Sequence, residues 1–169
     1  MQRRTLILGL TSLTALASCG GDSSPKLLWP YVGPPITQVQ IYKKKRVMYL
    51  FSNDKIVRTY DIALGGNPIG KKRFEGDGKT PEGLYYINRR NPNSSYHLSL
   101  GLSYPNPTDI AYAQENGRRP GGDIFIHGRA GKDKGRGSDW TAGCVAVTDT
   151  EIEDIYAMVA VGTPVWIYP

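Results

Sequence analysis

Cys144 and His127 are the two side chains of this chain whose types and positions suit covalent chemistry. A thiol with an ordinary pKa of about 8.5 is only a few per cent thiolate at neutral pH, so a cysteine nucleophile needs a base or a positive charge beside it. His97 lies inside a strand pattern, whereas His127 ends one and precedes Gly128, which lets the chain turn away and leaves the imidazole at a rim. The sequence therefore predicts a cysteine nucleophile with His127 as its base.

The residues around Cys144 also suit acyl chemistry. Ala142 and Gly143 are small, so backbone N–H groups are left to face the oxyanion of a tetrahedral intermediate. A capping box over 148–151 predicts a helix whose N-terminus would favour the thiolate. The alternative is that Cys144 is a buried small hydrophobe and His127 a hydrogen-bonded strand end.

The elements that must position these residues form a mostly β domain with one or two helices packed on a sheet. Two glycine-rich segments, 65–83 and 128–137, are predicted to be ordered loops bordering a site. Helices are expected over 108–114 and from the capping box to Gly162, the latter with Ile152, Ile155, Tyr156 and Val159 on one face. Strands are expected over 39–42, 47–51, 56–64, 84–88, 96–104, 123–127 and 164–168.

The N-terminus is typical of a secretory signal. Two arginines precede an apolar run over 6–17, which would span only about 20 Å as a helix, against roughly 30 Å for a bilayer core. The residues LASC, ending at Cys19, resemble the lipobox of bacterial lipoproteins, which implies a signal peptide over 1–18 and lipidation of Cys19. We therefore expect a tether over 19–36 and a catalytic domain over 37–169; the alternative is a plain signal peptide cut nearby, with Cys19 incidental.

Composition and net charge limit the kinds of binding partner and cofactor that are expected. The formal net charge is +6, and removal of Arg3 and Arg4 leaves 19 basic against 15 acidic residues, or +4, which suits an anionic cell-wall polymer or a membrane surface. The basic residues are scattered without interleaved aromatics, so no nucleic-acid platform is expected. Two cysteines and two histidines at these spacings match no tetrahedral zinc site, so neither a metal nor another cofactor is expected.

The segments around the two candidate residues resemble a known family. IHG at 126–128 followed by TAGC at 141–144 is similar to the HG and S/T-x-G-C motif of the L,D-transpeptidase catalytic (YkuD) domain family. The segments IALGGNPIGKKRFEGDGKTPEGLYYI, YHLSLGLSYPN and PGGDIFIHG look like the YafK-type branch of that family. The resemblance extends from about Val39 to Tyr168.

This resemblance implies a β-sandwich-type fold, a place in the bacterial cell envelope and peptidoglycan stem peptides as substrate, with roles in cell-wall biogenesis and cell shape. Cys144 would attack the carbonyl of a diaminopimelate or lysine residue linked to D-alanine and form a thioester, which an amine or water resolves. His127 would be the base, and Thr141 with Gly143 would shape the site and its oxyanion hole.

The resemblance also suggests residues that line a substrate groove. His97, Ser99 and Tyr104 fall in a segment shared with the YafK-type branch, although they are equally compatible with ordinary strand positions. Asp139 and Trp140 would contact the stem peptide or merely fix the loop. Arg129 would meet stem carboxylates, unless it belongs to a solvated loop.

Two departures from the family pattern bear on the reaction. Cross-linking members resembling this chain read S-H-G-C-I-R, whereas here Ala142 replaces the histidine and Ala146 the arginine. This keeps a hydrolase, an amidase or L,D-carboxypeptidase, as an alternative to a transferase, and a non-catalytic cell-wall-binding lipoprotein as an alternative of another class. The residue directly after Cys19 is Gly20 rather than the aspartate that resembles an inner-membrane retention signal. A periplasm-facing position on the outer membrane is therefore expected.

Overall fold

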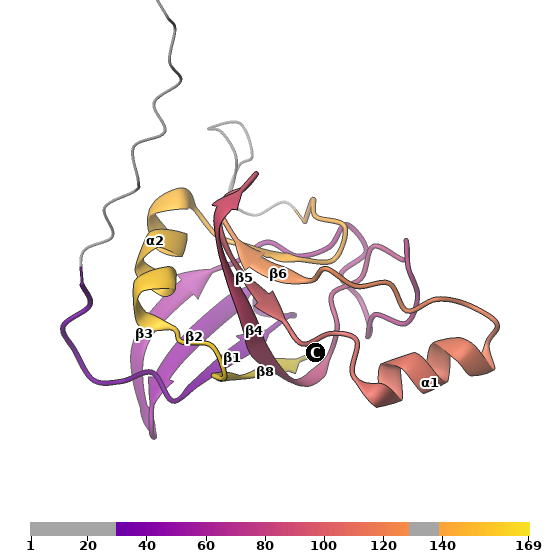
Figure 1. The fold of residues 1–169 in the computed structure, drawn as a ribbon, viewed down its shortest axis with the longest axis horizontal. Coiled ribbons are helices and arrows are strands. Elements are labelled where there is room, and N and C mark those ends of the chain that lie inside the picture. The colour runs from indigo at the N-terminus through magenta and orange to yellow at the C-terminus, as the bar shows by residue number, and fades with distance from the viewer. Residues whose placement is uncertain (1–29, 129–138) are drawn as a thin grey trace, which may run out of the picture.

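The computed structural model describes residues 30–128 and 139–169, which contain one mixed sheet and two helices (Figure 1). Across the sheet the strand order is β3-β2-β1-β8-β4-β5-β6-β7. The strands are β1 Gln38–Tyr42, β2 Val47–Ser52, β3 Lys55–Asp61, β4 Gly83–Ser94, β5 His97–Leu102, β6 Phe125–His127, β7 Val145–Ala146 and β8 Pro164–Tyr168. The helices are α1 Pro107–Glu115 and α2 Asp149–Met158. The mostly β architecture expected from the sequence is confirmed.

Two hairpins form the first half of the sheet. β1 pairs antiparallel with β2, and β2 with β3. The connecting turns place Arg46 and Asn53 at φ values of 55° and 53°, a left-handed conformation that asparagine tolerates well and arginine less so. On the other side of β1, the C-terminal strand β8 pairs with it in parallel.

The long strand β4 joins the two halves of the sheet. Its first residues, 83–86, pair with β8, and its later residues, from Ile87 to Ser94, pair with β5 through two register shifts. Such irregularities bend a strand, so β5, β6 and β7 continue at a different orientation (Figure 1). β7 pairs in parallel with β6, and this places the chain after Cys144 beside the chain before His127.

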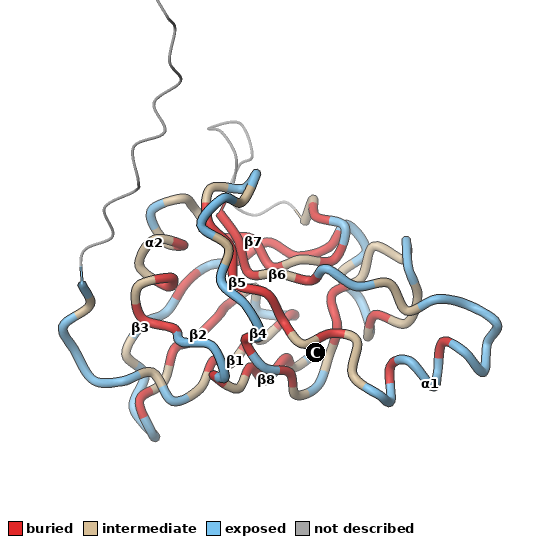
Figure 2. Tube along the Cα trace, in the orientation of Figure 1, coloured by how far each residue is buried: buried red, intermediate tan, exposed pale blue. Residues whose placement is uncertain are grey.

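One core cluster contains buried residues of all eight strands and of α2, and Figure 2 shows the buried strand segments. Thr148 caps the N-terminus of α2, and its side chain accepts a hydrogen bond from the Glu151 N–H, so the predicted capping box is confirmed. The helix buries Ile152, Ile155, Tyr156 and Met158. The predicted end at Gly162 is wrong, because the helix stops at Met158 and Gly162, at φ 91°, lies in the turn to β8.

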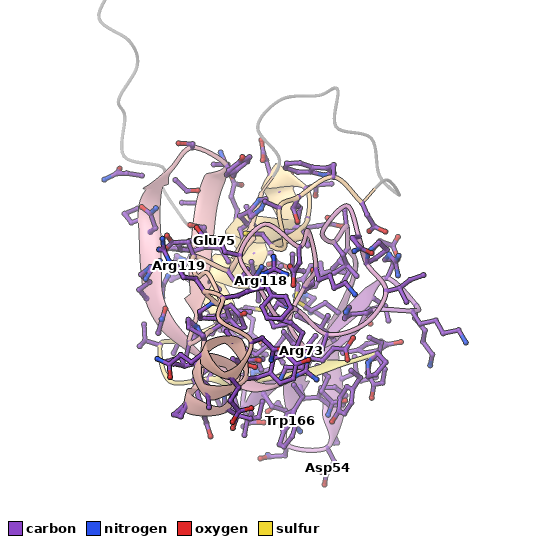
Figure 3. All side chains as sticks on the ribbon, turned by 90° about the vertical axis from the view of Figure 1, so that its right-hand side faces the viewer. Asp54, Arg73, Glu75, Arg118, Arg119 and Trp166 are labelled. Atoms are coloured by element: carbon purple, nitrogen blue, oxygen red, sulfur yellow. The ribbon has the colours of Figure 1, made fainter. Side chains whose placement is uncertain are left out.

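The loop over 65–83 is held against α1 rather than forming an element of its own. Arg118 and Arg73 lie over the rings of Phe74 and Tyr112, with the guanidinium carbon 4.0 and 4.1 Å from the ring centres (Figure 3). Asp77 accepts hydrogen bonds from the N–H groups of residues 73, 74 and 79 and pairs with Lys72 at 3.0 Å. The predicted ordered loop is therefore confirmed.

The N-terminal predictions lie mostly outside the described residues. The signal peptide, Cys19 and most of the tether precede residue 30, and nearly all of the second glycine-rich loop falls between Gly128 and Asp139. Within the described parts, neither helix has the length and apolar character needed to cross a membrane.

Candidate active site

The paired strands β5, β6 and β7 bring the candidate residues to one face of the sheet. Ser99 lies directly opposite His127, and Phe125 is two residues before His127 on the same strand. Residues two apart on a strand point to the same side. Val145 is the parallel partner of Ile126, so Cys144, one residue earlier, lies beside Phe125. The nucleophile and base predicted from the sequence therefore lie on neighbouring segments of the β6–β7 pair.

A cavity of about 270 Å³ opens above this face. Cys144, His127 and Ser99 all line it, and its other walls come from the end of β4, the turn that follows it and the start of β6. These further lining residues are Asn91, Ser94, Ser95, Tyr96, Asp123 and Phe125. A thiol, an imidazole and several hydroxyl groups therefore share one concave space.

His127 is fixed in the tautomer that a base requires. Its side chain is only 3% exposed, and Nδ1 lies 2.5 Å from the Gly128 carbonyl oxygen. Because a carbonyl only accepts hydrogen bonds, Nδ1 carries the proton and Nε2 of the neutral ring is the acceptor. The rings of Tyr96 and Trp140 lie against the imidazole, with centroids at 4.5 and 5.7 Å.

Cys144 is a free thiol at the entrance to β7. Its Sγ donates to the Asp123 carbonyl oxygen at 3.5 Å. Burial raises the pKa of the Cys144 thiol above its usual range, and the Asp123 charge adds to this, while a hydrogen bond with the Phe125 backbone and the charge of Lys72 act in the opposite direction. The resting side chain is therefore protonated at neutral pH, and a reaction at sulfur needs a base to remove the proton.

The residues before Cys144 form a turn closed by Thr141. The Thr141 hydroxyl donates to the Cys144 carbonyl oxygen at 2.8 Å and accepts from the Gly143 N–H at 3.1 Å. Gly143 adopts φ 136°, and a Cβ there would lie 2.6 Å from the Lys79 carbonyl oxygen. Thr141 and Gly143 thus shape the turn that presents the thiol, and the Gly143 N–H is engaged inside that turn.

Asp139 anchors the start of the same segment. Its carboxylate receives Nε and Nη2 of Arg46, the shortest contact being 2.6 Å, and it also accepts from the Leu64 N–H at 2.9 Å. The Trp140 and Thr141 N–H groups both donate to the Leu64 carbonyl oxygen. These contacts fix the start of the segment that leads to Cys144.

The other sequence-predicted groove residues are divided by the structure. Ser99 lines the cavity, whereas His97 pairs with Glu153 of α2 at 2.6 Å. Tyr104 is buried beside Tyr85 and donates to the Pro120 carbonyl oxygen at 2.9 Å, away from the cavity. Arg129 lies outside the described residues.

Sequence reasoning missed Tyr96 and Asp123. Tyr96 directly precedes His97 in a turn whose position became visible only with the β4–β5 register, and it covers the His127 ring. Asp123 adopts φ 54° and turns its carbonyl oxygen toward Sγ. The predicted strand over 123–127 therefore starts too early, because β6 begins at Phe125 and a left-handed aspartate leaves little trace in a sequence.

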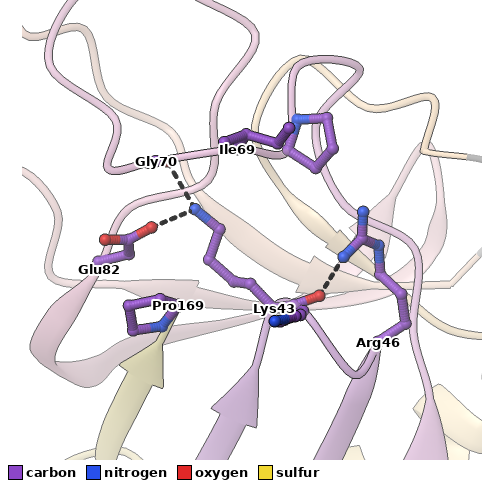
Figure 4. Close-up of a pocket in the computed structure, with 8 residues that line it drawn as sticks. Lys43, Arg46, Ile69, Gly70, Glu82 and Pro169 are labelled. Carbon is purple, nitrogen blue, oxygen red and sulfur yellow. Dashed lines mark hydrogen bonds and ion pairs between the residues drawn. The ribbon is translucent and has the colours of Figure 1, made fainter.

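A second, larger cavity of about 510 Å³ lies beyond the β1–β2 turn (Figure 4). Its side chains include Lys43, Ile69, Glu82 and Pro169, with no thiol or imidazole among them. Among the described residues, no cluster of three or more histidine, cysteine or acidic side chains is placed to hold a metal ion.

Comparison with known proteins identifies the family to which this fold and its cysteine–histidine cavity belong. The L,D-transpeptidase catalytic domain profile, YkuD, matches residues 36–167. The chain therefore belongs to the YkuD L,D-transpeptidase catalytic domain family. The predicted resemblance to this family, YafK-type branch included, is confirmed.

Individual relatives support the same assignment. YafK of Escherichia coli K12 is 29% identical over 173 residues, covering 94% of this chain and 64% of YafK, so the chain spans less than two thirds of that relative. The helical cell shape determining protein Pgp2 of Campylobacter jejuni superimposes with a TM-score of 0.59 at 27% identity, over 81% of this chain and 49% of Pgp2. The L,D-transpeptidase of Enterococcus faecium shares the fold at 15% identity and a TM-score of 0.53, over 80% and 50% of the two chains.

Proposed function

We propose that the protein is a cysteine acyltransferase that acts on the stem peptides of peptidoglycan. The observation that carries the proposal is the shared cavity, in which Cys144 and an oriented, buried His127 meet on a chain of the L,D-transpeptidase family. Family membership suggests the substrate class, and the similarity to a helical cell shape determining protein is consistent with a role in the cell wall.

The geometry suits a two-step reaction. His127 Nε2 takes the proton from Cys144 Sγ, and the thiolate attacks the carbonyl carbon of a diaminopimelate or lysine residue linked to D-alanine. The C–N bond then breaks, the imidazolium returns its proton to the departing amine, and a thioester remains on Cys144. The Gly128 carbonyl oxygen stabilises the imidazolium through Nδ1.

The second step needs an acceptor. An amine would give a cross-link or a protein attachment, and sulfur is a good leaving group toward it. Water is the second candidate, because the motif positions differ from cross-linking relatives. Ala142 is exposed, and Ala146 is fully buried and exchanges two 2.8 Å backbone hydrogen bonds with Ala63. We therefore propose hydrolysis as the alternative outcome of the same thioester.

A lipid anchor on Cys19 and a periplasm-facing position, on the outer membrane in a diderm cell, are part of the proposal. They rest on the LASC segment and on Gly20 alone. Mass analysis of the membrane fraction would show a lipidated N-terminal Cys19, whereas a soluble chain cleaved elsewhere would contradict the anchor.

Purified muropeptides of defined tetrapeptide stem test the reaction. Wild-type protein is expected to release D-alanine and to give either a cross-linked or a shortened product, resolved by mass spectrometry. Cys144→Ala should give neither, while Tyr104→Phe, which changes a hydroxyl outside the cavity, should react like wild type. Tight binding of the muropeptide without any product would favour the non-catalytic cell-wall-binding protein.

A further inference from the structure

The rings of Tyr96, His127 and Trp140 contact one another at the candidate site. Tyr96 lies tilted over His127 with centroids 4.5 Å apart and planes at 32°, and Trp140 meets the imidazole edge-on at 5.7 Å and 68°. Tyr96 and Trp140 also contact one another, at 5.8 Å. Tyr96 is 38% exposed and lines the cavity, so its ring covers the side of the imidazole next to the substrate space.

The hairpin end that carries Tyr96 is held from several sides. The Tyr96 N–H donates to Ser94 Oγ at 3.1 Å, and the next residue, His97, adopts φ 73° and pairs with Glu153 of α2. The Tyr96 carbonyl oxygen lies 2.8 Å from the position that a Cβ on Gly128 would occupy. The hairpin and α2 therefore hold the Tyr96 backbone, and the ring contacts with His127 and Trp140 place its side chain.

A ring face so placed has an electrostatic effect on the imidazole. The face of an aromatic ring is negative and attracts a cation within about 6 Å of its centroid, and has no comparable attraction for a neutral group. Removal of the thiol proton by His127 creates such a cation next to Tyr96.

Other ionisable groups act on the same imidazole from each packed element. Cys144 lies beside it from β7, and Asp123 precedes its own strand. Asp149 of α2 has Oδ1 2.7 Å from a Cβ placed on Gly128, and the His97–Glu153 pair lies between β5 and α2. The carboxylates of Asp123, Asp149 and Glu153 favour imidazolium as Tyr96 does, so the Tyr96 contribution must be measured with these charges kept.

We propose that Tyr96 is a positioning residue that holds the His127 ring and stabilises its protonated form during proton transfer from Cys144. The S–H bond breaks, the electron pair stays on sulfur, and the proton binds Nε2. This inference rests on the proposed function for its catalytic meaning, but the state of His127 can be observed without any substrate.

Two measurements on the full chain test it. The chain has only two histidines, so the imidazole C2 protons give two NMR titration curves, and His97→Gln identifies the His97 curve. In Tyr96→Leu the His127 curve should move to lower pH, because the cation has lost its stabilising face. The rate of Cys144 alkylation by iodoacetamide at pH 7, followed on the Cys144 peptide, should fall by roughly 2-fold to 30-fold.

Tyr96→Phe is the matched control, because it keeps the ring and removes the hydroxyl. It should titrate and alkylate like wild type. If Phe behaves like Leu, or if Leu leaves both the curve and the alkylation rate unchanged, the inference is wrong. Tyr96→Met provides a second ring-free variant if Leu lowers the melting temperature, and absence of muropeptide turnover in wild type with both shifts present would contradict only the proposed function.

Discussion

The two cavities of this protein show that size is a poor guide to chemistry. The larger one, about 510 Å³, contains Lys43, which is 2% exposed and donates to Glu82 and to the Gly70 carbonyl oxygen (Figure 4). Lys43 also donates to the Thr80 carbonyl oxygen. Burial lowers the pKa of the Lys43 ammonium, and Glu82 opposes this. The smaller cavity, about 270 Å³, contains a thiol and an oriented imidazole.

The difference lies in where each cavity meets the fold. The larger one is bordered by the β1–β2 turn and the loop over 65–83, where a buried ion pair connects two segments. The smaller one lies at the end of β6 and the start of β7, where two backbone segments deliver reactive groups side by side. We infer that the larger cavity has a structural role and that the smaller cavity is the reaction site.

Loss of either reactive group should have the largest effect. Cys144→Ala and His127→Gln are each expected to lower muropeptide turnover by at least about 10³-fold, since nucleophile and base act as one unit. Their melting temperatures should stay near that of wild type. Product assays on both variants check this, and a Cys144→Ala protein that keeps more than a tenth of the activity would remove the distinction between the cavities.

Gly143→Ala should damage the smaller cavity through the backbone. The substitution strains a residue at φ 136° and places a Cβ 2.6 Å from the Lys79 carbonyl oxygen, at a combined cost of about 2–5 kcal/mol. Turnover and unfolding free energy should both fall. Gly66→Ala is the matched control, because a Cβ there meets nothing within 4 Å. Equal effects of the two variants would show that the turn tolerates rearrangement.

Lys43→Met tests the larger cavity. It removes one member of a largely buried ion pair, Lys43–Glu82, and should cost about 3 kcal/mol of unfolding free energy in urea titrations. The folded fraction should keep its turnover per molecule. Exposed Lys44, from the same turn, is the control, and Lys44→Met should change little. A loss of turnover without loss of stability would mean that the larger cavity takes part in the reaction.

Asp139→Asn should have an intermediate effect on the smaller cavity. The asparagine amide keeps the shape of the carboxylate but loses the charge-assisted pairing with Arg46. That pairing contributes about 1.5–3 kcal/mol to the free energy of unfolding. Turnover should fall by about tenfold, because the segment leading to Cys144 is less firmly held. A double-mutant cycle with Arg46→Gln measures the coupling, and purely additive effects would argue against the anchor.

The pH dependence of stability should give the smallest signal. Because burial raises the pKa of the Cys144 thiol, the unfolded chain ionises first, and the thiol's stabilising contribution is present below its ordinary pKa and lost as pH rises through the folded value. Urea unfolding at pH 7 and pH 10 should therefore show a larger loss in wild type than in Cys144→Ser. The same loss in both would mean that the thiol is not shielded from solvent.

The sequence predicted those parts of the fold that rest on local signals. The capping box at Thr148, the strand ending at His127 and the glycine-rich loop over 65–83 are each marked by neighbouring residue types. β7 was not predicted as a strand, because two residues cannot show an alternating pattern. The end of α2 was not predicted correctly, because Val159 already adopts an extended conformation, three residues before Gly162.

The residues of the candidate site also fall into those that local sequence signals predict and those that they do not. Cys144 and His127 could be singled out by chemistry, whereas Tyr96 and Arg46 depend on contacts between distant segments. Arg46 is 93 residues from its partner Asp139. The segment over 62–65 brings them together, because the Ile62 N–H donates to the Arg46 carbonyl oxygen and the Leu64 N–H donates to the Asp139 carboxylate. His97 and Tyr104 belong to the same predicted groove segment as Ser99. The His97 side chain pairs with α2, however, and the Tyr104 side chain is buried in the core.

Trapping the acyl-enzyme tests the central claim most directly. Wild-type protein mixed with a tetrapeptide muropeptide and quenched in acid should gain the mass of the donor without its D-alanine, and peptide mapping should place that mass on Cys144. His127→Gln should accumulate none. Product formed with no adduct on Cys144, or an adduct that forms equally well in His127→Gln, would contradict the account.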